Sequence, residues 1–334
     1  MLKKGRLMRS IKALLPIVLL LIHVSCDDER EALDFDFEIP RTEVFPDSIR
    51  AYQLFTEPLA DLTPHPSAVL YELSSELFTD YAGKQRLIRL PEGAQARVQE
   101  GRVVYPEGTL LAKTFYFDSD QNDPTQDRKI VETRLLVKRE GQWNVATYQW
   151  NEDQSDAYLT LEGATAEVTL MDDAQVIRQT THQLPSEVAC VTCHQDTAQS
   201  VYIGPSLKNL DREVERGGAM VNQLEYFASL GLFPADLRSP SPMVNYKDES
   251  RSLDQRARAY LDINCAHCHQ PNGWSRPADE GLDLRYEVPF ANTGISDKRK
   301  ALKRNVQSGE MPFIGTTLKH DEGIELLLSY FDAL

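Results

Sequence analysis

Two five-residue stretches with the same pattern constrain this chain more than any other feature of its sequence. Residues 190–194 (CVTCH) and 265–269 (CAHCH) both have the pattern Cys-x-x-Cys-His, and with Cys26 they account for all five cysteines. This pattern is the signature of c-type haem attachment, in which two thiols one helical turn apart bond the porphyrin and the next histidine ligates the iron. The sequence therefore predicts two covalently bound haem c groups. Their thiols are Cys190, Cys193, Cys265 and Cys268, and their proximal iron ligands are His194 and His269.

Three other uses of paired cysteines fit less well. A four-cysteine zinc site usually has about 15–20 residues between its pairs, whereas 71 residues separate Cys193 from Cys265. A redox dithiol normally follows a strand in a βαβ unit and has no need of a histidine after each pair. Local or long-range disulfides are the third alternative, and they leave both histidines without a role.

The N-terminus predicts export. Residues 1–12 carry five basic side chains, residues 13–22 are apolar, and Ser25 precedes Cys26, which together form a secretory signal over residues 1–25. A membrane-spanning anchor is the alternative, but it needs roughly 20 apolar residues. HVSC resembles a lipobox, although His23 stands where leucine is usual, so we expect lipidation at Cys26 and a membrane-anchored periplasmic lipoprotein. Exported thiols are normally consumed in disulfides or cofactors.

The charge balance limits the partners. Removal of residues 1–25, with five basic and no acidic residues, changes the net charge from −15 to −20. Nucleic-acid-binding proteins carry basic faces, so we expect no nucleic-acid partner. The stretch KRKALKR (298–304) has five basic residues in seven. It could pair with haem propionates, dock an acidic redox partner or be a solvated helix face.

The pattern of apolar residues changes along the chain. Residues 26–47 are acidic and proline-dotted, as in a tether, and residues 48–182 contain strand-like runs, including a hairpin at 132–150 around Arg139-Glu140-Gly141-Gln142. Helical spacing follows at 222–233, 252–264 and 321–331, and Ser252 and Gln255 stand at capping-box spacing. The predicted fold class is α+β: an N-terminal β-rich, sandwich-like domain, then a mainly α-helical cytochrome c-type haem region. Its first haem would lie in 183–250 and its second in 251–334.

Methionines are the candidate distal ligands. Met311 lies in GEMPFIGT, 42 residues after His269, and resembles the Met-Pro loop of class I cytochromes c. For the first haem the candidate is Met243; Met220, His182 or a vacant position stay open. His267 is expected to be a solvated bystander.

With these residues named, the chain resembles a family of exported two-haem c-type cytochromes. The resemblance runs from about residue 45 to the end, and its longest matching stretches are YELSSELFTDYAGKQRLIRLPEG (71–93), ETRLLVKREGQWNVATYQWNEDQSDA (132–157) and RARAYLDINCAHCHQPNG (256–273). The C-terminal part also resembles the cytochrome module of some PQQ-dependent sugar dehydrogenases. Family members usually have Met-Pro-Pro where this chain has Met311-Pro312-Phe313.

The resemblance implies electron transfer. We expect a two-haem cytochrome that carries single electrons between a periplasmic donor and acceptor, with a dehydrogenase or another cytochrome as redox partner. One alternative is a two-haem peroxidase or oxidase with an open site at the first haem. Another is a redox docking subunit for a dehydrogenase, with the β-rich domain as its binding module.

Overall fold

The computed structural model describes residues 45–334 except for short gaps, which are 100–101, 121–126, 173–174, 188, 191–194, 197–198, 201–203, 272, 274–280 and 313–314. All the described residues belong to one compact unit, Glu38–Leu334. The predicted signal, Cys26 and most of the predicted tether lie outside the described residues, as do Cys193 and His194. The boundaries predicted after residues 182 and 250 stay predictions. Among the described residues, no helix is both long and apolar enough to cross a membrane.

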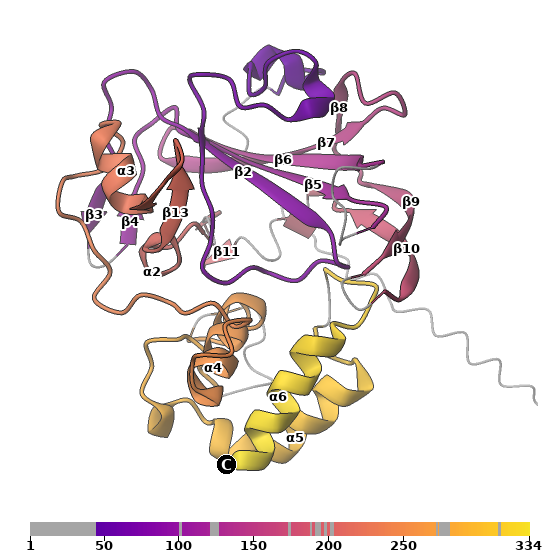
Figure 1. Cartoon of the computed structure of the whole chain (residues 1–334), viewed down its shortest axis with the longest axis vertical. Helices are drawn as coiled ribbons and strands as arrows, with labels where there is room; N and C mark the ends of the chain where they lie inside the picture. Colours follow the sequence, from indigo (N-terminus) through magenta and orange to yellow (C-terminus); the bar gives the residue numbers. More distant parts are fainter. Residues whose placement is uncertain are drawn as a thin grey trace, which may run out of the picture. The chain divides into compact units, whose positions relative to one another are not determined.

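A six-stranded antiparallel sheet is the largest element of the fold (Figure 1). Its strands, in spatial order, are β1 (Val69–Leu70), β2 (Gly83–Arg89), β5 (Leu110–Phe117), β6 (Lys129–Arg139), β7 (Gln142–Trp150) and β8 (Ala157–Thr160). β6 and β7 form the hairpin predicted at 132–150, with Arg139 paired to Gln142. Glu140 and Gly141 both have positive φ angles, 50° and 77°, as a two-residue hairpin turn requires. That prediction is confirmed.

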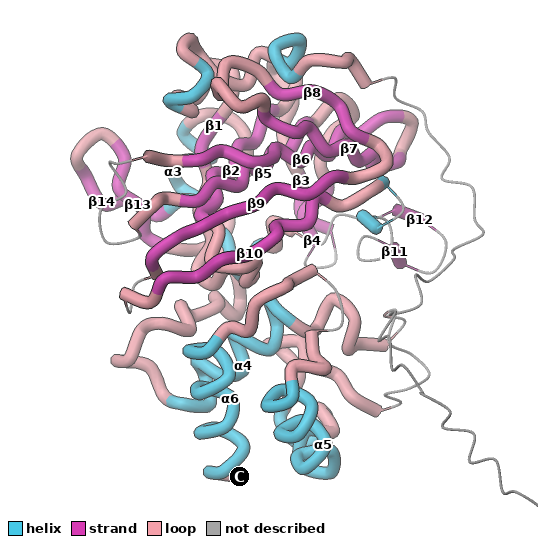
Figure 2. Tube along the Cα trace, turned by 90° about the vertical axis from the view of Figure 1, so that its right-hand side faces the viewer, coloured by secondary structure: helices cyan, strands magenta, loops and turns pink. Residues whose placement is uncertain are grey.

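Short two-stranded ladders accompany this sheet. Those within the described residues are β3 (Arg97–Gln99) with β4 (Arg102–Val104), β9 (Ala164–Met171) with β10 (Ile177–Leu184), β11 (Gln195–Asp196) with β12 (Gln199–Ser200), and β13 (Glu213–Arg216) with β14 (Ala219–Asn222). The β9–β10 hairpin is the longest of them and lies along one side of the main sheet (Figure 2). Val168 and Leu170 of β9 pack there against Phe115 and Phe117 of β5.

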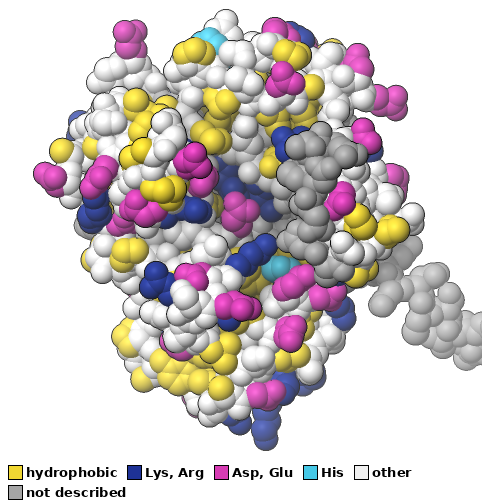
Figure 3. All heavy atoms as spheres, in the orientation of Figure 1, with side chains coloured by type: hydrophobic (Ala, Val, Ile, Leu, Met, Phe, Trp, Pro, Cys, Tyr) yellow, Lys and Arg dark blue, Asp and Glu magenta, His cyan; other side chains and the backbone are white. Residues whose placement is uncertain are grey.

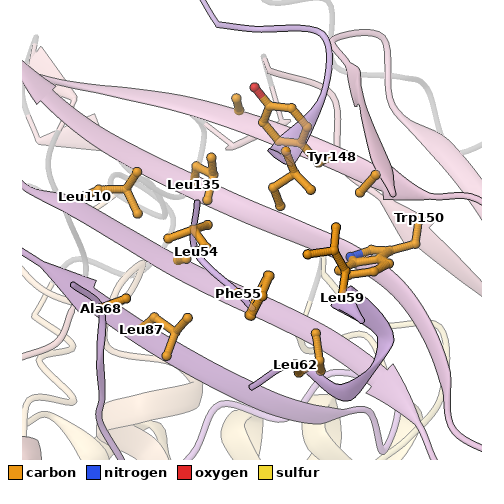
Figure 4. Packing of buried hydrophobic residues seen from close by; sticks show 14 of the residues in the cluster. Leu54, Phe55, Leu59, Leu62, Ala68, Leu87, Leu110, Leu135, Tyr148 and Trp150 are labelled. Atoms are coloured by element: carbon orange, nitrogen blue, oxygen red, sulfur yellow. The ribbon is translucent and has the colours of Figure 1, made fainter. Parts of the chain in front are cut away.

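One face of the main sheet is apolar. Because side chains alternate along a strand, Leu87, Leu110, Leu135 and Tyr148 point to the same side, and Figure 4 shows them packed together. The chain before β1 covers this face. It contains the short 3₁₀ helices η1 (Ile49–Tyr52) and η2 (Leu59–Asp61) and contributes four apolar side chains, Ile49, Leu54, Leu59 and Leu62, each at most 5% exposed.

The opposite face, here called the mixed face, changes character along each strand. At one end Leu111 and Trp143 pack with the helices α2 (Leu207–Leu210) and α3 (Gln223–Ser229). At the other end Phe115 and Phe117 pack under the β9–β10 hairpin. Between these two apolar ends, β5 places Lys113 on the same face. A charged side chain therefore lies between the two apolar ends, in the middle of the mixed face.

Three longer helices complete the fold, α4 (Leu253–Asn264), α5 (Ile295–Ser308) and α6 (Asp321–Ala333). α4 begins with the predicted capping box of Ser252 and Gln255. α4 and α6 share an apolar cluster, and a Cβ atom at Gly323 would lie 2.3 Å from the Tyr260 hydroxyl oxygen. The two helices therefore approach so closely that α6 needs a glycine there. The helices predicted at 252–264 and 321–331 are confirmed.

The predicted fold class is wrong. The chain is sheet-rich, and its described residues show no mainly α-helical C-terminal haem module. Between β10 and α4 the described residues include the strands β11–β14 and the helices α2 and α3, of only four and seven residues, and α2 and α3 pack on the mixed face. Pro234, Pro240 and Pro242 interrupt helix formation after α3. The predicted sandwich is also not formed, because the second layer on the mixed face is a two-stranded hairpin.

Candidate functional site

The second Cys-x-x-Cys-His motif continues the last turn of α4. The amide of Cys265 donates to the Leu261 carbonyl at 2.9 Å, and the amides of Cys268 and His269 donate to the Cys265 carbonyl at 3.1 and 2.9 Å. These bonds wind residues 265–269 into a turn, so the two thiols lie on one side. Burial, then the neighbouring Cys268 and Asp262, raise the pKa of the Cys265 thiol to about 12. Both cysteines are thiols, not disulfide sulfurs.

Backbone contacts hold this turn from both sides. The His269 carbonyl accepts from the Leu284 amide at 2.9 Å. The side-chain oxygen of Asn264 accepts from the Phe78 amide, which belongs to the loop before β2, at 2.8 Å. A Cβ atom at Gly273 would lie 2.1 Å from the Cys268 carbonyl oxygen. The chain after the motif therefore folds back on it so tightly that only glycine fits.

The first motif begins on the mixed face of the sheet. Cys190 is 8% exposed, and its amide donates to the Ser186 carbonyl at 3.0 Å. Burial raises the pKa of its thiol, while Arg134 of β6 lowers it, Glu132 raises it and the adjacent Thr147 of β7 lowers it. Cys190 therefore lies against β6 and β7. Its partners in the motif, Cys193 and His194, are outside the described residues.

The two candidate methionines lie in different surroundings. Met311 is half-buried in the loop between α5 and α6, and its amide donates to the Asn305 carbonyl at 3.2 Å. Met243 is 4% exposed and packs in the apolar cluster of α4 and α6, which also contains Ala266 and Cys265. The described contacts therefore bring Met243 to the second motif, whereas those of Cys190 are with the sheet.

His267, expected to be a solvated bystander, is half-buried, and burial, the charge of His269 and the charge of Lys113 lower its pKa to about 4. Lys113 belongs to β5. The second motif therefore faces the charged band of the sheet, as the first motif does.

This band, here called the basic band, consists of four side chains on three adjacent strands: Lys84 and Arg86 of β2, Lys113 of β5 and Arg134 of β6. Figure 3 shows Lys and Arg side chains gathered in a central hollow of the surface. Arg86 pairs with Glu76 at 2.8 Å, and Arg134 pairs with Glu132 at 2.5 Å. Glu132, 0% exposed, also contacts His182, with 2.8 Å between Oε1 and Nε2.

Sequence reasoning missed the basic band, although a signal for it exists. Lys84 and Arg86 occupy alternate positions of β2, and Lys113 interrupts the apolar run LLAKTFYF. A basic residue inside an apolar strand is unusual, because burial of an unpaired charge is costly. What the sequence does not give is the register that brings the three strands together.

The second motif fits covalent haem. Two neighbouring thiols on one side of a helical turn, followed directly by a histidine, form the donor set that haem c requires. Within the described part of the chain, no three His, Cys, Asp or Glu side chains converge as ligands of a bare metal ion. Comparisons with family models, curated proteins and solved structures gave no match.

Proposed function

We propose that this chain is an exported c-type electron-transfer protein with two covalent haem groups. The observation that carries the proposal is the turn at 265–269, which follows α4 without a break and sets two thiols and a histidine in sequence. Bound haem would supply one-electron exchange between ferric and ferrous iron. Cys190 lies on the sheet face that the second motif also faces, and this supports a relay through two neighbouring groups.

In this proposal each residue of the motifs has one role. The thiols of Cys265 and Cys268 attach one haem, with His269 as proximal and Met311 as distal ligand. Cys190 and Cys193 attach the other, with His194 as proximal ligand. Met243 is the distal candidate from the sequence, but its place in the α4–α6 cluster favours a core role. Lipidation at Cys26 would hold the protein at a periplasmic membrane face.

Haem stoichiometry tests the proposal directly. Protein matured with the haem-attachment machinery should show two haem additions by intact mass. The double variants Cys190→Ala/Cys193→Ala and Cys265→Ala/Cys268→Ala should each lose one addition and keep the other. Bound zinc, or a wild-type mass without haem, would overturn the proposal.

A redox partner protein, such as a dehydrogenase or another cytochrome, would dock on the basic side of α5. Lys300 and Arg304 are exposed there, close in sequence to Met311, and Lys303 pairs with Asp332 at 2.5 Å. A basic face on an otherwise acidic chain favours an acidic partner. Electron transfer from such a partner should slow with rising salt, and more steeply in the wild type than in Lys300→Glu/Arg304→Glu.

One observation favours a second function, a peroxidase or oxidase at the first haem. The buried pair of Glu132 and His182 lies on the same face as Cys190, and a carboxylate–imidazole pair can move protons during peroxide cleavage. A five-coordinate, high-spin first haem that reacts with peroxide, and loses this reaction in His182→Gln, would support the enzyme. A six-coordinate, unreactive haem would exclude it.

A further inference from the structure

The basic band is built by strand register. Arg86 of β2 pairs directly with Lys113 of β5, and Lys113 pairs directly with Arg134 of β6. Like charges in directly opposed positions of a sheet destabilise it. Three cations in one row across the sheet therefore need an anion that compensates them.

The cations also converge on one side chain. The Phe115 ring, 0% exposed, has the Lys113 Nζ atom 5.0 Å from its centroid, the Arg134 Cζ atom at 4.4 Å and the Lys84 Nζ atom at 5.9 Å. A single ring contacts three positive groups. The attraction of a ring for a cation is about 0.5–2 kcal/mol, too little to offset burial of this much charge.

The described residues supply only part of the compensating charge. Two carboxylates, Glu76 and Glu132, are paired to the two arginines. Lys84 donates to the Ala82 carbonyl at 2.9 Å. For the ammonium of Lys113, the described residues offer no hydrogen bond or ion pair. Counted over the described residues, four basic side chains and two paired carboxylates leave two basic groups, Lys84 and Lys113, without a carboxylate partner.

The pKa values of the two lysines reflect this arrangement. Burial lowers the pKa of Lys84 to about 7; Glu76 opposes this, while Arg86, Lys247 and Arg134 add to it. Burial and the charges of Arg134, Arg86 and Lys84 hold the pKa of Lys113 well below its usual range. A bound anion would raise both pKa values.

The band lies within reach of both motifs. Arg134 pairs in register with Thr147, the residue beside the Cys190 thiol. The second motif directly follows Asn264, whose side-chain oxygen accepts from the Phe78 amide in the loop before β2, the strand of Lys84 and Arg86. A group attached to either motif could therefore place its acidic substituents on the band.

We propose that Lys84, Arg86, Lys113 and Arg134 form one carboxylate-binding site whose ligand is the haem propionates. This inference rests on the proposed function. It makes the β-sheet the floor of the haem site, and the two lysines match in number the two propionates of one haem. The same site could instead take a small free oxyanion, and the experiment separates these two sources.

The test uses holoprotein variants that remove one charge each. Lys113→Met and Lys84→Met should fold, because each removes a half-buried charge and keeps an apolar stem. Lys138→Met is the matched control: Lys138 lies on the same face of β6, but its Nζ atom donates to the Tyr105 carbonyl at 2.7 Å. Lys113→Arg keeps the charge. Haem content is first determined by intact mass for every protein.

If propionates are the ligand, redox titration should show at least one haem potential shifted downward in Lys113→Met and Lys84→Met. The potentials of Lys138→Met and Lys113→Arg should match the wild type.

If a free oxyanion is the ligand, sodium formate should bind the wild type saturably in calorimetry. Lys113→Met should lose this binding, and the haem potentials should be the same in all variants. The inference is overturned if potentials and formate binding are the same in all variants. A protein without haem would refute the proposed function, while formate calorimetry would still test the site.

Discussion

The side-chain oxygen of Asn264, the last residue of α4, lies 2.8 Å from the backbone nitrogen of Phe78 and accepts its hydrogen. The side-chain nitrogen of Asn264 donates in turn to the Tyr260 carbonyl at 3.1 Å. One amide therefore ties the helix before the second motif to the loop before β2. The residue directly before the motif is therefore held to the loop that leads into the sheet.

Replacement of Asn264 by alanine should lower the free energy of unfolding by about 1–3 kcal/mol, because it leaves the partly buried Phe78 amide without its acceptor. Urea unfolding measures this loss. Asn292 is exposed in the short helix η3 (Phe290–Asn292), and Asn292→Ala should leave stability within about 0.5 kcal/mol of the wild type. An equal loss in both variants would contradict a specific role of Asn264.

The glycine of α6 leads to a prediction opposite to the helix-propensity rule. Alanine in place of glycine normally stabilises a helix interior by about 1 kcal/mol. Gly323→Ala should instead destabilise by about 1–3 kcal/mol, because its Cβ atom overlaps the Tyr260 phenol, whose hydroxyl contacts His320 Nδ1 at 2.9 Å. Thermal unfolding reports the sign. Glu325→Ala, at an exposed position of the same helix, should not destabilise.

His320 should make stability depend on pH. Its ring is 7% exposed and stacks on Phe78 with 4.2 Å between centroids. Burial, then Lys247 and Lys84, lower its pKa to about 4; Asp321 opposes this and Arg178 adds to it. Glu322 Oε2 lies 3.5 Å from its Nε2 atom.

Between about pH 4 and 6.5, His320 binds a proton in the unfolded chain, where its pKa is near the ordinary 6.5, but not in the folded chain. Stability from this group is therefore complete above pH 6.5 and is lost as the pH falls to 4, by roughly 3 kcal/mol in total. Urea unfolding at pH 7 and pH 5 should show a smaller difference for His320→Phe than for the wild type. A half-buried histidine outside this cluster provides the control, His65→Gln, which should keep the wild-type difference.

The two methionines should respond differently to alanine. Under the proposed function, Met311→Ala should remove the distal ligand of the second haem, which would lower its potential and give a high-spin optical spectrum with little loss of stability. Met243→Ala should cost about 2–5 kcal/mol of stability, since Met243 is 4% exposed in a packed cluster, and should leave the haem spectra unchanged. The reverse result would make Met243 the ligand.

Local patterns predicted local structure in this chain. The turn at Glu140-Gly141 and the capping box at Ser252 depend on neighbouring residues, and both formed as expected. The predicted amount of helix after residue 183 is wrong, because α2 and α3 are short and pack on the sheet. Tertiary burial of their apolar side chains decided that region, and no short-range pattern reports it.

The candidate site likewise has one part that the sequence predicts and one part that it does not. The motif at 265–269 is contiguous, so its turn could be foreseen from spacing alone. The row of Arg86, Lys113 and Arg134 spans 49 residues of sequence and exists only because three strands pair in one register. A period-two pattern gives the face of each side chain but not its neighbour on the next strand. The basic band therefore could not be predicted from the sequence alone.

The alternation of β5 also predicts which mutations evolution can accept there. Ala112 faces the apolar cover, and its neighbours Leu111 and Lys113 face the other way. A one-residue insertion or deletion before Lys113 would turn every later side chain of the strand over, placing the ammonium among Leu87 and Leu135 and emptying the row between Arg86 and Arg134. A substitution in β5 changes one side chain at a time, whereas a change in the length of β5 changes the facing of all the side chains that follow it.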